Sequence, residues 1–530
     1  MPVIPTDHIP LHDSSINLDI SGVAGFFGGD VAVSAMGTVS LYKGRKWFGW
    51  YNSPGSYEIA KRYGRLAQHR FWCGLYPGVT DNPAVLFGLD GKVGPQYRAV
   101  HSGTSMNQTG HLAYLLCQEC KKTPAREWDK QIDSTRRTNP IDVTIAYLPH
   151  DPPEKLNPGA VEASVTTQLS FLPILSSAAA CLSCGFVADW YCFAMIAFGM
   201  FCSGASCYVI GSGEFTFTHP KPAGGAPSGD GILAHDVNDQ IVILRGAEGA
   251  VNAITRGRFS LDYKSHPSYH NIGWSSVLLT IQFLLQLLIV PQGTIFGQVM
   301  FLSSLAVSWV YNSFLSSLDK ESIQRRILFK TVLDGPVTYK YQLGTRTTMV
   351  VFVLLVLSSS QRMDQQGLRK VMDHLIPNDT RVWRSFKKTI VREIELLSIK
   401  RKEPAFQLPS SETLTGAEKE LSKNLYLDAQ TAYRAFQVYK SDRAEQEKER
   451  EDCQPPEEPE EQDQVDLYAD EYDEVSALRR FPDIGIVRKT ESYAGTSQTC
   501  NDSRRESVAE LDSDWHGSCS PTETNWHGGY

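Results

Sequence analysis

The chain has 530 residues, a net charge of −8, 42% hydrophobic residues and 21% charged residues. These averages exclude a collagen-like, a wholly disordered or a small disulfide-rich chain, and the acidic balance gives no basis for a general nucleic-acid binder. The charge is uneven, because residues 441–474 hold 16 acidic and 3 basic residues and the rest of the chain is net positive.

The first region, residues 1–165, mixes helix and strand patterns. Its start has neither a basic segment nor an apolar one, so a cleaved signal peptide is not expected. Residues 56–76 predict a helix, and residues 141–147 alternate apolar and polar side chains as a strand does. We therefore expect a small α+β region here.

The cysteines of this region are candidate metal ligands. Cys117 and Cys120 form a CxxC pair, with His111 upstream and the i, i+4 pair His69 and Cys73 as further donors. A structural zinc site needs four ligands, normally two such pairs, and no second CxxC follows. The eleven cysteines are scattered, which argues against a disulfide framework. We predict reduced, buried thiols and no metal site.

The first apolar block predicts a helical hairpin. Residues 169–188 and 190–210 are uncharged, and Asp189 between them suits a tight turn. About 20 helical residues reach about 30 Å, the thickness of the hydrocarbon core of a bilayer. We predict two transmembrane helices.

The second block, residues 274–290 and 294–315, predicts another transmembrane hairpin. Pro291 to Gly293 forms the turn, and Trp274, Trp309 and Tyr311 lie toward one end, where an aromatic belt is expected. The alternative, buried core helices of a large soluble protein, is weaker because such helices rarely run this far without charge.

The connection between the blocks, residues 211–272, predicts a strand–helix–strand unit. Its elements are a strand at 240–244, a helix at 246–256 and a strand at 259–263.

Residues 316–440 predict an α/β region with amphipathic helices. Residues 347–361 are apolar but too short to cross as a helix, so a buried strand or a re-entrant segment is favoured over a crossing. Residues 381–402 predict a basic amphipathic helix. It either lies on an anionic membrane leaflet or packs on its own domain, and the second interpretation is favoured. Thr415 and Glu418 match a capping box that opens a further helix with an apolar stripe.

The last region, residues 441–530, is predicted to be a disordered acidic tail, because it is too polar to bury a core alone. It contains Asp512 and Asp514 in a DxD pattern and Ser507 beside two arginines. Both are weak matches that chance explains.

Charge asymmetry gives the predicted orientation. The turns around Asp189 and Pro291 hold no Lys or Arg, whereas Lys264 and Lys320 and several arginines flank the other ends of the helices. The positive-inside rule then places the N-terminus, the connection and the C-terminus in the cytoplasm.

The predicted spans carry no charged residue or histidine, unlike most proton relays. Gln282, Gln286 and Gln298 form either a polar path or interhelical hydrogen bonds, and the stripe of Gly199, Ser203 and Cys207 predicts close helix packing. Neither a P-loop, a Rossmann glycine fingerprint, HExxH nor GxSxG is present in the sequence.

Four stretches, residues 251–263, 269–301, 304–321 and 343–357, resemble a group of uncharacterised multi-pass membrane proteins of basidiomycete fungi. The resemblance covers roughly residues 160–400. It implies membrane placement and no catalytic residue.

The sequence therefore predicts an α-helical polytopic membrane protein with two transmembrane hairpins, cytoplasmic α+β regions and a disordered acidic tail. We predict no catalytic, cofactor-binding or metal-binding residue. The expected partners are the lipid bilayer, anionic lipid in contact with residues 381–402, and proteins that bind the acidic tail. The leading function is a non-enzymatic scaffold or regulatory component. The alternatives are membrane shaping, by analogy with reticulon-like hairpins, a channel or transporter through the Gln-bearing helices, and an enzyme in residues 1–165.

Overall fold

The computed structural model describes residues 27–79, 82–127, 140–161, 168–235, 240–266, 268–359, 361–400, 404, 406 and 415–453. Chain contacts divide the protein into residues 1–455 and 456–530, and all described residues belong to the first unit. Most of the predicted acidic tail, with Ser507, Asp512 and Asp514, lies outside the described residues.

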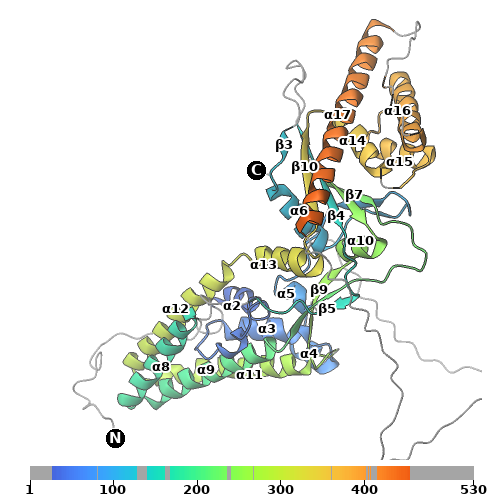
Figure 1. Cartoon of the computed structure of the whole chain (residues 1–530). Coiled ribbons are helices and arrows are strands. Elements are labelled where there is room, and N and C mark those ends of the chain that lie inside the picture. Colours follow the sequence, from blue (N-terminus) through green and yellow to red (C-terminus); the bar gives the residue numbers. More distant parts are fainter. Residues whose placement is uncertain are drawn as a thin grey trace, which may run out of the picture. The chain divides into compact units, whose positions relative to one another are not determined.

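Four apolar helices correspond to the predicted hairpins (Figure 1). They are α8 (Phe171–Phe186), α9 (Trp190–Ile210), α11 (His270–Ile289), which continues into the 3-10 turn η3 (Val290–Gln292), and α12 (Ile295–Ser316). Among the described residues, α9, α11 with η3, and α12 are long and apolar enough to cross a membrane. The 16 residues of α8 extend only about 24 Å, so this helix is shorter than the predicted 169–188.

The four helices do not pack as two separate hairpins. α9 lies against α8, as predicted, but α11 packs on α9 and on α3, whereas α12 packs on α8 and on α2. The arms of the second pair thus contact different helices of the first.

Short helices and turns precede the first apolar pair. They are α2 (Gly29–Met36), η2 (Arg45–Trp47), α3 (Ser56–Leu66), α4 (Arg70–Leu75), α5 (Pro83–Leu86) and α6 (His111–Lys122). The single helix predicted at 56–76 is wrong, because Ala67 adopts an extended conformation and ends α3. The His69 side chain then accepts a hydrogen bond from the Phe71 N–H and begins α4.

A seven-stranded sheet in the order β2-β1-β7-β8-β4-β10-β3 organises the polar part of the chain. Its strands are β1 (Gln96–Ala99), β2 (Ser105–Met106), β3 (Arg126–Glu127), β4 (Ile141–Leu148), β7 (Gly231–His235), β8 (Gln240–Gly246) and β10 (Val337–Leu343). β4 and β8 are parallel, and β10 runs antiparallel to β4. The strands predicted at 141–147 and 240–244 are confirmed.

A second, three-stranded sheet has the order β5-β6-β9, with β5 (Lys155–Leu156), β6 (Glu214–Thr218) and β9 (Arg258–Asp262). The predicted helix at 246–256 is α10 (Glu248–Thr255), and the predicted strand at 259–263 is β9. β8 and β9 belong to different sheets, so the expected strand–helix–strand unit is instead a connection between sheets.

The three polar regions expected as separate stretches fold together. Residues 1–165 supply β1 to β4, residues 211–272 supply β7 and β8, and residues 316–440 supply β10 of one sheet. The domain boundaries drawn from the sequence therefore mark chain order and not independent folding units.

Residues 320–358 connect α12 to this sheet and supply a buried helix. They form α13 (Lys320–Ile327), the π-helical turn η4 (Leu328–Val332), β10 and α14 (Arg346–Ser358). α14 is a helix and not the strand favoured by the sequence, since Thr345 caps its first turn by accepting from the Thr348 N–H. All its residues from Thr347 to Ser358 are buried in the domain.

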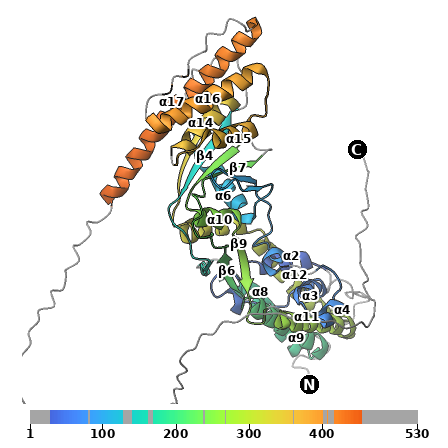
Figure 2. The ribbon, with the colours of Figure 1, turned by 90° about the vertical axis from the view of Figure 1, so that its right-hand side faces the viewer.

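Three further helices cover α14 (Figure 2). They are α15 (Gln365–Leu375), α16 (Arg381–Lys400) and α17 (Gly416–Cys453). The apolar side chains Phe386, Ile390 and Ile394 of α16 are buried in this cluster. The basic amphipathic helix thus packs on its own domain, and anionic-lipid contact by 381–402 stays a prediction for its exposed basic side chains.

The capping box of α17 is confirmed, because the Thr415 N–H and hydroxyl both donate to the Glu418 carboxylate. The apolar stripe is buried at Leu425, Ala429 and Phe436. The helix continues to Cys453, so the tail boundary at 441 is wrong: the i, i+4 ion pair of Arg443 with Glu447 stabilises the extra turns.

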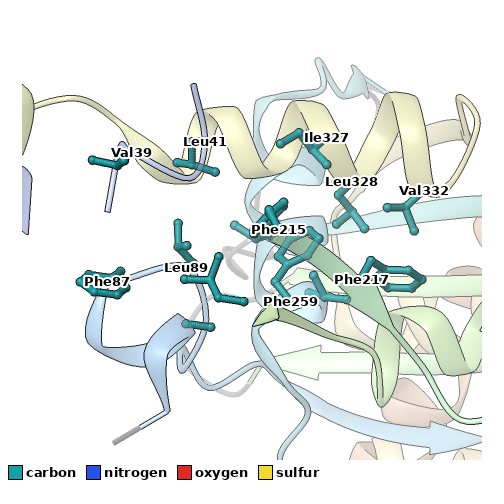
Figure 3. Close-up of a cluster of buried hydrophobic side chains, with 14 of the residues drawn as sticks. Val39, Leu41, Phe87, Leu89, Phe215, Phe217, Phe259, Ile327, Leu328 and Val332 are labelled. Atoms are coloured by element: carbon teal, nitrogen blue, oxygen red, sulfur yellow. The ribbon is translucent and has the colours of Figure 1, made fainter. Parts of the chain in front are cut away.

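An apolar core lies beside the three-stranded sheet. Figure 3 shows Phe215, Phe217 and Phe259 of this sheet gathered with Ile327 and Leu328, which belong to α13 and η4. The same core continues into the apolar helices, because it includes Cys202, Cys207 and Ile210 of α9 and Ile272 and Leu279 of α11.

Candidate membrane-embedded site

Large apolar side chains are exposed along all four apolar helices. Leu175 of α8 is 64% exposed, Leu288 of α11 65% and Val310 of α12 60%. Others on the same helices are Leu172, Leu182, Phe201, Ile281, Leu284 and Phe314. Contiguous apolar surface of this kind is unfavourable in water and marks a contact with a membrane or a protein.

Aromatic side chains are exposed near both ends of these helices. Trp190 and Tyr191 begin α9, and Tyr208 lies in its last turns. Trp274 is 64% exposed near the start of α11, as the predicted belt requires. Tyr311 does not belong to the belt, because it is buried and packs edge-on against Tyr51.

An irregular segment, residues 48–55, is inserted among the apolar helices; it is aromatic up to Tyr51 and polar at Asn52 and Ser53. Asn52 is fully buried at its centre. Its backbone N–H donates to Ser177 Oγ of α8 at 3.1 Å, and its side-chain Nδ2 donates to Ser304 Oγ of α12 at 2.9 Å. These serines lie near the middle of their helices, so the segment reaches the interior of the helical cluster.

The small-residue stripe of α9 receives this segment. A Cβ on Gly199 would lie 2.2 Å from Asn52 Oδ1, and a Cβ on Gly49 would lie 2.2 Å from the Cβ of Cys207. Gly204 accommodates the Trp50 ring. The sequence predicted close packing against another helix here; the stripe instead forms a groove for residues 48–55.

A second set of polar contacts holds the same segment to α12. The Tyr51 hydroxyl donates to Asn312 Oδ1 at 2.8 Å, and Asn312 Nδ2 donates to Ser53 Oγ at 3.2 Å. The Arg45 guanidinium is buried and lies 5.2 Å from the centre of the Tyr311 ring. Buried polar groups are costly without partners, and these contacts offset part of that cost; among the described residues, Asn52 Oδ1 and Arg45 Nε have no hydrogen-bond partner.

The three predicted glutamines are all buried, but they do not meet as one path. Gln298 Nε2 donates to the Gly293 carbonyl at 3.1 Å and so stabilises the turn before α12. Gln286 Nε2 lies near Asn52, since both surround the position of a Cβ on Gly199. Within the described part of the chain, Gln282 Oε1 and Gln286 Nε2 have no hydrogen-bond partner.

Asp189 joins the two turns at one end of the helices. Its Oδ2 accepts from the backbone N–H and the hydroxyl of Thr294, each at 2.7 Å, and its Oδ1 accepts from the Cys192 N–H at 3.1 Å. Gly297 is required beside it, because a Cβ there would lie 2.0 Å from Asp189 Oδ2. The sequence indicated the turn but gave no signal for this contact.

The candidate zinc ligands of residues 69–120 do not come together in the structure. His111 Nε2 is 2.7 Å from Gln324 Oε1, and the His69 side chain caps α4. Burial raises the pKa of the Cys117 thiol to about 12. In the ranges that the structure describes, no three His, Cys, Asp or Glu side chains are arranged to hold a metal ion.

No protein-family model, curated protein or solved structure matches this chain. The resemblance to basidiomycete membrane proteins stays a prediction, and the site is interpreted from its own residues.

Proposed function

We propose that the protein is a multi-pass integral membrane protein that holds a non-enzymatic scaffold or regulatory domain at one membrane surface. The shared seven-stranded sheet is the observation that carries this proposal. It combines strands that precede α8, strands between α9 and α11, and a strand that follows α12. If the apolar helices enter a bilayer, each pair must return the chain to the side from which it started.

The exposed apolar helices support membrane insertion, and Asn52 with its serine partners helps to accommodate the inserted segment there. The basic residues at the sheet-proximal ends of α11 and α12 favour a cytoplasmic sheet domain. The exposed side chains of α17 from residue 441 onward offer a surface for a protein partner.

The first experiment is extraction of membranes from expressing cells with alkaline carbonate. The full-length protein should stay with the bilayer and be released only by detergent. Recovery in the aqueous fraction would refute the membrane proposal.

A labelling experiment separates crossing from membrane shaping. The 16-residue α8 favours a wedge in one leaflet, whereas the lengths of α9, α11 and α12 favour crossing. In a background in which the exposed Cys73 is replaced by Ser, Trp190→Cys places a thiol at the exposed start of α9, and Lys122→Cys places one on the sheet domain. In sealed vesicles, crossing predicts that an impermeant maleimide labels the two thiols from opposite sides; inaccessibility of the first from both sides favours the wedge.

A second candidate function is a channel or transporter, because the buried Gln282 and Gln286 carry polar atoms without a partner among the described residues. Substituting both by Leu should then abolish flux in reconstituted vesicles. Unchanged flux, or none in the wild type, removes this candidate.

A further inference from the structure

A cavity of about 440 Å³ lies where the last turn of α9 leads into β6. Lys43, Lys46, Trp47, Gly211 and Glu214 are among the residues that line it. Lys43 is exposed and Lys46 half-buried, so both ammonium groups are available to a ligand.

The side chains beside this cavity change character along the α9 axis. Trp50 packs against the exposed Phe201, and two helical turns further on, about 10 Å, Trp47 packs against Tyr208. The Lys46 ammonium lies 5.8 Å from the centre of the Tyr208 ring. The Phe201 ring in the middle of α9, the Tyr208 ring in its last turns and the Lys46 ammonium beside that ring are apolar, amphipathic and charged in turn, which is the order of chemistry across a membrane interface.

The charge around the cavity favours an anion. Among the lining residues, Lys43 and Lys46 outnumber the single carboxylate, Glu214. Burial raises the pKa of the lining Tyr42 phenol, and the Arg326 guanidinium opposes that rise.

We propose that this cavity binds the phosphate-bearing headgroup of an anionic phospholipid, with Lys43 and Lys46 on the phosphate and the acyl chains beside Trp47 and Trp50. The inference rests on the proposed membrane location. It assigns a site distinct from the basic face of α16.

The test measures phospholipid binding to the full-length protein in detergent by native mass spectrometry, with phosphatidylserine and phosphatidylcholine as probes. A surface-proximal lysine contributes about fivefold to the binding of anionic lipid, so Lys43→Gln with Lys46→Gln should weaken phosphatidylserine binding about 30-fold. Phosphatidylcholine has no net charge because its quaternary ammonium balances its phosphate, so it should bind the wild type more weakly than phosphatidylserine and lose less affinity in this variant. Lys121→Gln with Lys122→Gln removes two exposed charges from the end of α6 and should bind like the wild type.

Further arms identify the ligand source and the competing surface. Inorganic phosphate or glycerophosphoserine at a concentration equal to that of phosphatidylserine should not displace it, since neither carries acyl chains. Displacement at equal concentration would indicate a free-phosphate site and overturn the proposal. Loss of binding in Lys388→Gln with Arg392→Gln, and not in the Lys43 and Lys46 variant, would move the site to α16.

Carbonate extraction of the membranes from which the protein is purified, before detergent is added, keeps the two proposals apart. A wild type that stays with the bilayer yet binds both lipids equally refutes the headgroup site alone. A wild type recovered in the aqueous fraction refutes the membrane location.

Discussion

Replacing Asp189 by Ala tests whether the two turns are held together as the structure shows. The substitution removes acceptors for three donors, namely the Cys192 N–H, the Thr294 N–H and the Thr294 hydroxyl. The carboxylate is only 4% exposed, so water does not readily replace it. Each of the two hydrogen bonds from Thr294 to the charged carboxylate contributes about 1.5 kcal/mol or more, and loss of the N-cap bond to Cys192 costs about 1 kcal/mol. The expected loss in the free energy of unfolding is therefore about 4 kcal/mol.

The assay is denaturant unfolding of the full-length protein in detergent micelles. Thr294→Val removes the hydroxyl donor and the cap that Thr294 Oγ1 provides to the Gly297 N–H, and it should cost about 2 kcal/mol. The double variant should lose less than the sum, because the two side chains share one contact. A change within about 0.5 kcal/mol for Asp189→Ala would refute the reasoning.

Three other substitutions probe different parts of the molecule. Gly199→Val should destabilise the helical cluster by at least about 2 kcal/mol, because its Cβ would meet Asn52 Oδ1, and thermal unfolding in detergent measures this loss. Leu354→Ala should lower the free energy of unfolding by about 2–5 kcal/mol, since this side chain of α14 is fully buried; an unchanged midpoint would contradict the assignment of α14 to the core. The backbone N–H and hydroxyl of Thr415 lower the pKa of Glu418 from 4.5, so its stabilising contribution is present above pH 4.5 and is lost as the pH falls through the lowered value. The stability difference between wild type and Glu418→Gln should therefore shrink in acid, and a constant difference across the pH series would exclude the capping interaction as its source.

The long apolar helices could be predicted from the sequence because each is determined locally. Helix length, hydropathy and turn residues are properties of one stretch of chain, and the bounds of α9 match the prediction residue for residue. The same local reasoning was wrong for residues 347–361. A short apolar run fits a buried strand or a buried helix equally well, and the choice between them depends on the Thr345 cap and on the helices that cover α14.

The inserted segment could not be predicted, because its determinants lie far apart in the chain. Asn52 is polar and follows an aromatic run, which locally indicates a surface loop. Its burial depends on Ser177 and Ser304, which lie 125 and 252 residues away, and on the space left by Gly199. Gly199 was visible in the sequence as part of a small-residue stripe, but a stripe specifies only that something packs closely and not what does so.

The same distinction explains why the sheet gives more topological information than the hydropathy pattern. Hydropathy treats each apolar stretch separately and leaves open whether the 16 residues of α8 cross, wedge or lie beside their neighbours. Pairing of β7 with β1, and of β8 and β10 with β4, requires the chain before α8, between α9 and α11, and after α12 to occupy one compartment. If either helix pair enters a bilayer, an odd number of crossings within that pair is therefore incompatible with the folded sheet.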